Sequence, residues 1–147
     1  MGDVRDLSSA PSARRSGWRP VDDELTLRAE RHAPRLARHW VMRAIAAEGV
    51  VGSNNQVIEL LTGELVSNAV VHGPADGEVL VGLRVDRRTV RVSVRDTGQG
   101  RPRVRHPEPT APSGRGLALV EALSSAWGTA THADGGKTVW FDVELDD

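Results

Sequence analysis

The middle of the chain alternates apolar and other residues over two consecutive runs, and this pattern constrains the fold more than any other feature. Apolar side chains occupy every second position at Val79, Val81, Leu83 and Val85, and again at Val90, Val92 and Val94. The short polar segment Asp86-Arg-Arg88 joins the two runs. A period of two residues on both sides of a turn predicts an antiparallel hairpin with one buried face.

Three segments have the spacing of amphipathic helices. Apolar residues recur at helical spacing between Pro34, which suits a helix start, and Gly49, which ends the run. A second helix is expected from the polar capping residues 53–55 to about His72. A third is expected over residues 117–127, where apolar residues again recur at helical spacing.

Further strands complete a two-layer domain. Leu25–Ala29 alternates and predicts a first, edge strand, and two last strands, about 128–133 and 137–145, flank the turn sequence Asp134-Gly-Gly136. Strands in runs with helices gathered between them predict an α+β fold. The simplest packing is a mixed, mainly antiparallel sheet with about three helices on one face.

The composition narrows the functional classes. The length of 147 residues fits one domain, at 21–147, after a flexible tail at 1–20 that is rich in Ser, Arg, Ala and Pro. The net charge of −1 supplies no basic field, and we expect no direct nucleic-acid partner. The absence of cysteine excludes disulfides and thiol chemistry. With no bilayer-spanning apolar run and no signal-peptide pattern, we expect a cytoplasmic protein without a membrane partner.

Glu64, Asn68 and His72 are four residues apart, so they lie close together on one face of the second helix. Spacing alone fits an ordinary solvated helix face. The residue types point further, because Asn is a poor helix former, and its amide oxygen is a ligand that Mg²⁺ accepts beside phosphates. Glu64, one turn earlier, could act as a general base toward a hydroxyl or water.

A lone carboxylate and two glycine-rich segments suggest a purine nucleotide. Asp96 closes the clearest strand, where it could accept a hydrogen bond from the exocyclic amine of adenine, although Asp-Thr-Gly also fits a plain turn. Gly98 and Gly100 allow the backbone to approach a base or phosphate closely. Gly114-Arg-Gly116 precedes the expected third helix and offers N–H groups to an anion, although glycine before a helix is common.

Two further sequence patterns give weaker evidence for a nucleotide site. The loop arginines Arg101, Arg103 and Arg105 fit contact with phosphates and fit equally a role in keeping the loop soluble. Gly136-Lys-Thr138 looks like the end of a Walker A loop, but the earlier glycine that such a loop requires is Thr131 here, and a strand follows rather than a helix. We therefore exclude a Walker A site.

Four segments, in the right order, resemble the boxes of the histidine kinase-like ATPase (GHKL) superfamily. Glu64–Gly73 resembles its N box, Asp96–Gly100 its first glycine box, Gly114–Val120 its second, and Gly136–Phe141 its closing strand. The overall length and the run Leu119–Gly128 are most similar to small anti-sigma factor serine kinases of the RsbW/SpoIIAB type.

The resemblance implies a Bergerat-type ATP-binding fold over about residues 25–145, with ATP and Mg²⁺ as cofactors. Glu64 would activate a serine hydroxyl on a partner protein, Asn68 would ligate Mg²⁺, and Asp96 would read adenine. The implied nucleotide-binding set is Asn68, His72, Asp96, Gly98, Gly100, Gly114, Arg115, Gly116, Leu117 and Thr138. Thr138 would support the adenine pocket. The family's usual partners are a sigma factor and a phosphate-accepting anti-anti-sigma protein of the STAS type, and its members commonly form homodimers.

Three functions stay open, and the sequence departs from the family pattern in places. Gly63 stands where a serine often precedes the glutamate, and residues 101–113 carry four prolines. The first function is an ATP-dependent serine kinase that also sequesters a sigma factor. The second is a non-catalytic interaction module that uses ATP only as a structural ligand. The third is a scaffold that binds no nucleotide. The catalytic half of a two-component histidine kinase is disfavoured, because no dimerisation helix with a phosphoaccepting histidine precedes the domain.

Overall fold

The computed structural model describes residues 21–97 and 112–145. The elements in these ranges are β1 (Val21–Arg28), α2 (Ala33–Ala47), α3 (Ser53–His72), β2 (Glu78–Val85), β3 (Thr89–Asp96), α4 (Pro112–Leu123), β4 (Ala126–Thr131) and β5 (Lys137–Glu144). The predicted tail, the glycines Gly98 and Gly100, and the three loop arginines lie outside the described residues. No helix of the described part is long and apolar enough to cross a membrane.

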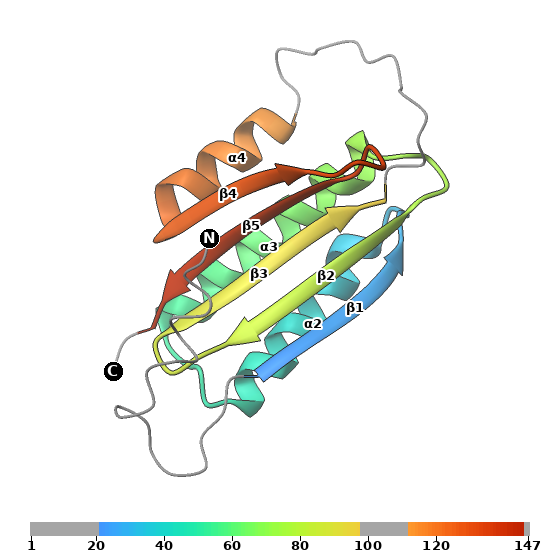
Figure 1. Ribbon diagram of the computed structural model, residues 1–147. Coiled ribbons are helices and arrows are strands. Elements are labelled where there is room, and N and C mark those ends of the chain that lie inside the picture. Colours follow the sequence, from blue (N-terminus) through green and yellow to red (C-terminus); the bar gives the residue numbers. More distant parts are fainter. Residues whose placement is uncertain (1–20, 98–111, 146–147) are drawn as a thin grey trace.

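The five strands form one sheet in the order β1-β2-β3-β5-β4, and every neighbouring pair is antiparallel. The helices of the described residues lie together on one face of this sheet and leave the other face open (Figure 1). The predicted α+β fold, a two-layer sandwich, is confirmed. The described sheet is antiparallel throughout rather than mixed.

The alternating runs build the core as expected. Val90, Val92 and Val94 on β3 face the helices and are at most 3% exposed, and their cross-strand neighbours on β2 and β5 are also apolar. Phe141 on β5 is fully buried in the same layer. Pleating sends successive side chains to opposite faces, so the residues between them line the open face.

Helix α3 is the central helix, packed against α2, α4 and the middle of the sheet. Its fully buried apolar residues are Ile58, Leu61 and Val66, with Leu65 nearly so. Helix α2 begins next to Pro34 and buries Ala37, Val41 and Ile45, which are four residues apart on one face. The bounds predicted for these two helices agree closely with the structure.

The third helix differs most from its prediction. We expected it to begin after Gly114-Arg-Gly116, but α4 begins at Pro112 and includes those residues. Proline favours the first turn of a helix, because its fixed backbone angle suits that turn and its missing N–H needs no partner there. The helix ends at Leu123, and Trp127 belongs to β4 instead. The Ser124 hydroxyl donates to the Val120 carbonyl at 2.6 Å where the helix ends.

Candidate functional site

Helix α3 presents Glu64 and Asn68 to the start of α4. A Cβ atom built on Gly116 would lie 3.1 Å from Glu64 Oε1 and 3.3 Å from Asn68 Nδ2. The two side chains therefore converge on one point of the α4 backbone, and Gly116 itself is buried. A Cβ at this position would contact a carboxylate and an amide at once, both more closely than most Cβ contacts in proteins, so glycine relieves crowding here.

Asp96 lies beside the C-terminal end of α3. A Cβ atom on Gly73, the residue after α3, would lie 3.3 Å from Asp96 Cβ and 2.6 Å from the Ala69 carbonyl oxygen. The Asp96 side chain is buried, and Oδ1 accepts a hydrogen bond from the Lys137 backbone N–H at 3.3 Å. His72 is half-buried in the last turn of α3. The last two turns of α3 thus bring the Asn68 amide, His72 and the Asp96 carboxylate to one end of the domain.

Thr138 does not join this group. Its cross-strand neighbour on β3 is Arg95, so its side chain lies on the open face of the sheet, opposite to that of Asp96. The Thr138 hydroxyl is 2.7 Å from His132 Nε2 on that face. Lys137, the preceding residue, is paired with Asp96. Counting back in twos from the buried Phe141 also places Lys137 on the face of the sheet that Asp96 shares.

The second glycine segment is only partly described. Gly114 and Arg115 lie in the first turns of α4, and Leu117 is half-buried and packs against the core. Because the helix begins at Pro112, the glycines are part of its first turns and do not precede it as a separate loop. Gly116 places this part of α4 next to Glu64 and Asn68.

A groove between α2 and α3 reaches Glu64 from the other side. It has a volume of about 430 Å³, and its lining includes Arg38, Leu60, Glu64 and Ser67. The Arg38 side chain lies over Gly63, where an added Cβ would be 2.8 Å from Nη1 and 3.1 Å from Cδ. Arg38 was not among the predicted site residues, and the glycine at position 63 leaves room for its side chain.

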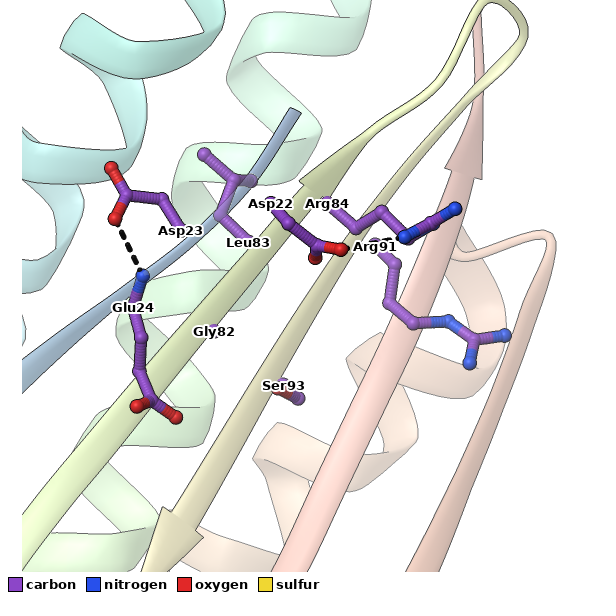
Figure 2. Close-up of a pocket in the computed structure, with 8 residues that line it drawn as sticks. All are labelled: Asp22, Asp23, Glu24, Gly82, Leu83, Arg84, Arg91 and Ser93. Carbon is purple, nitrogen blue, oxygen red and sulfur yellow. Dashed lines mark hydrogen bonds and ion pairs between the residues drawn. The ribbon is translucent and has the colours of Figure 1, made fainter. Parts of the chain in front are cut away.

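The open face of the sheet carries a second depression, of about 580 Å³ (Figure 2). Its arginines are already engaged: Arg84 Nη1 is 2.7 Å from Asp22 Oδ2, and Arg91 forms two hydrogen bonds with Asp142 at 2.7 and 3.0 Å. The Arg91 guanidinium also lies 4.0 Å from the centre of the Trp140 ring. None of the predicted site residues lines this depression.

Comparison with known proteins identifies the family of this chain. Residues 26–143 match the family model of the histidine kinase-like ATPase domain. The structure is similar to that of the RsbU and RsbW domains of Rv1364c from Mycobacterium tuberculosis, with 31% identity and a TM-score of 0.67 over 90% of this chain and 33% of that one. This chain thus spans about a third of that structure. A histidine kinase domain from Erythrobacter litoralis EL346 is 27% identical, with a TM-score of 0.39, over 63% of this chain and 45% of that one. No curated protein matches.

Proposed function

Because the chain belongs to the histidine kinase-like ATPase domain family, we propose that it binds ATP and Mg²⁺ and phosphorylates a serine of a small partner protein. The observation that carries this proposal is the convergence of Glu64 and Asn68 on Gly116 beside the end of the helix that reaches Asp96. The Glu64 carboxylate and the Asn68 amide on α3 then lie between α4 and the end of β3, where Asp96 would bind the purine.

The donor set fits the nucleotide and its metal. The Asn68 side-chain oxygen is a hard, neutral ligand of the kind that Mg²⁺ uses together with phosphates and waters. The buried Asp96 carboxylate would accept from the adenine amine. When bound, Mg²⁺ would offset the charge of the triphosphate. The glycines of α4 would let the backbone approach the phosphates, and His72, Arg115 and Leu117 would border the same site.

Glu64 would serve as the general base. Glu64 is among the residues that line the α2/α3 groove, and a partner's serine hydroxyl would approach the carboxylate through this groove. The hydroxyl proton passes to the Glu64 carboxylate as the serine oxygen bonds to the γ-phosphorus. The bond from that phosphorus to the bridging oxygen breaks, and ADP leaves with the electron pair. General-base assistance typically contributes on the order of 10²–10⁴ in rate.

The similarity to a structure that contains an RsbW domain supports a proposal about the partners. We propose that the protein is an anti-sigma factor that binds a sigma factor as a homodimer and phosphorylates a STAS-type anti-anti-sigma protein. With such partners we expect it to act in the cytoplasm. Residues 21–147 would form the regulatory domain.

A second candidate is a non-catalytic interaction module that uses ATP as a structural ligand. The close packing of α4 on Glu64 favours it, because this carboxylate then helps to seat α4. Under this alternative, Glu64→Gln leaves nucleotide-dependent partner binding intact and no phosphate is transferred by the native protein.

The deciding experiment incubates the protein with Mg-ATP and its cognate anti-anti-sigma protein, and follows phosphoserine by mass spectrometry. The kinase proposal expects label with the native protein and a loss of about 10²–10⁴ in rate with Glu64→Gln. Glu121→Gln, an exposed change on α4, is the matched control and should leave the rate unchanged. Full labelling by Glu64→Gln would refute the assignment of the base, and absence of label with the native protein would favour the second candidate.

A further inference from the structure

Lys137 begins β5 directly opposite Asp96 of β3. Residues opposite each other in an antiparallel pair project from the same face of the sheet, with Cβ atoms about 4.5–5.5 Å apart. For Asp96 this is the face covered by helices, because its Cβ lies next to Gly73 at the end of α3. The β5 residue beside the purine-reading carboxylate is therefore a lysine, and not Thr138.

The two cross-strand neighbours of Asp96 differ in polarity. On β2 its partner is Val79, which is fully buried and offers no hydrogen bond, and on β5 it is Lys137, which is exposed. Within the described part of the chain, no ion pair holds the Lys137 ammonium to a carboxylate. An exposed, long and unpaired cation thus stands beside a buried acid.

The edge of adenine that carries its amine presents a donor and an acceptor side by side. The amine on C6 donates, and the ring nitrogen N1 next to it accepts. A carboxylate supplies an acceptor, and a lysine ammonium supplies three donors and no acceptor. Asp96 and Lys137 together offer the complement of this edge, whereas hypoxanthine presents the reverse order, with a carbonyl on C6 and an N1–H.

We infer that Lys137 is a specificity-determining residue whose ammonium donates a hydrogen bond to N1 of adenine while Asp96 accepts from the C6 amine. This inference rests on the proposed nucleotide site and names the group that completes its reading of the base. Thr138 has no such role, because it contacts His132 on the opposite face of the sheet.

The test is a thermodynamic cycle that combines the replacement of one ligand atom with the replacement of one protein residue. Dissociation constants are measured by calorimetry for ATP and for 1-deaza-ATP, in which a C–H replaces N1, with the native protein and with Lys137→Met. The native protein should bind 1-deaza-ATP about tenfold more weakly than ATP, the loss expected for a hydrogen bond to a charged group. Lys137→Met, which keeps the apolar stem, should bind both ligands equally.

Two controls isolate the effect. Thr138→Val should keep the tenfold preference of the native protein, and 7-deaza-ATP should bind the native protein like ATP, because its N1 is intact. A native protein that binds ATP and 1-deaza-ATP equally would overturn the role of Lys137 and leave the nucleotide site standing. If Lys137→Met prefers ATP over 1-deaza-ATP as strongly as the native protein does, the role of Lys137 is also overturned and the nucleotide site is unaffected. Failure of the native protein to bind either ligand would overturn the proposed function and this inference together.

Discussion

The Arg38 side chain lies over Gly63, close enough that a Cβ on that glycine would stand 2.8 Å from Nη1. The contact joins α2 to the turn of α3 that carries Glu64, and it forms part of the groove through which a partner would reach that carboxylate. The obstructing atoms belong to a flexible side chain, so Arg38 can move at little cost.

Gly63→Ala therefore should not destabilise the fold. Alanine favours a helix over glycine by about 1 kcal/mol, which offsets the displacement of Arg38. We expect an unchanged or higher melting temperature, unchanged ATP affinity and a higher KM for the protein substrate. A calorimetric scan and a phosphorylation series against the partner would measure these quantities. A fall in ATP affinity would show that the groove is not separate from the nucleotide site.

Gly116→Ala should have the opposite effect. The same gain in helix propensity applies, but the new methyl group would meet Glu64 Oε1 and Asn68 Nδ2. Crowding of this kind typically costs about 1–3 kcal/mol, so Mg-ATP affinity should fall about tenfold or more. Ala118→Gly, at an exposed position of the same helix, is the control: it should lower stability and leave ATP affinity unchanged. Native-like Mg-ATP affinity in Gly116→Ala would contradict the placement of α4 over the site.

Asn68→Ala should remove the metal dependence of nucleotide binding. If the Asn68 amide ligates Mg²⁺, the native protein gains thermal stability from ATP mainly when Mg²⁺ is present, and ligand at 100 times its dissociation constant adds about 2.7 kcal/mol. The variant should show the same small shift with Mg²⁺ and with a chelator. Ser67→Ala, its neighbour on α3, should behave like the native protein. A full Mg²⁺-dependent shift in Asn68→Ala would rule out this ligand.

Phe141→Ala tests which face of β5 is buried. The Phe141 side chain is fully buried, and removing such a side chain costs about 3–5 kcal/mol. Trp140→Ala, one residue earlier on the open face, removes the contact with the Arg91 guanidinium and should cost about 1 kcal/mol. Urea unfolding would give both values. Equal costs would contradict the assigned register.

Asp134 should make the β4–β5 turn sensitive to acid. The Gly136 backbone N–H that donates to its carboxylate lowers the pKa of Asp134, and the Arg95 guanidinium lowers it further. A lowered folded pKa adds stability above the unfolded pKa of about 3.9, and this stability is lost as the pH falls through the folded pKa. The small destabilisation by Asp134→Asn at neutral pH should therefore shrink below about pH 4. A difference that is independent of pH would count against this account.

Local patterns predicted the elements well where one physical cause dominates. The alternation of Val90 to Val94 and the run from residue 53 to His72 each follow from a single buried face, so period alone located them. The start of α4 was missed because Pro112 stands at the end of a long Pro- and Gly-rich stretch, which reads as a loop. In the structure this helix packs against α3, a contact that no local pattern shows.

Site residues carried by one element were likewise predictable, and those set by register or packing were not. Glu64 and Asn68 were predicted together because one helix carries both, and the structure brings both to α4. Thr138 was chosen by its position in a motif, while the pleat of β5 places Lys137 on the same face of the sheet as Asp96. The groove at Arg38 arises where two helices pack side by side, and no local pattern encodes that contact.

Helix α3 packs against α2 on one side and α4 on the other, with Glu64 at the boundary between them. A protein bound in the α2/α3 groove and a nucleotide bound next to α4 would therefore both contact α3. If ATP raises the affinity for the partner by some factor, the partner must raise the affinity for ATP by the same factor, because the coupling free energy between two binding equilibria is the same in both directions.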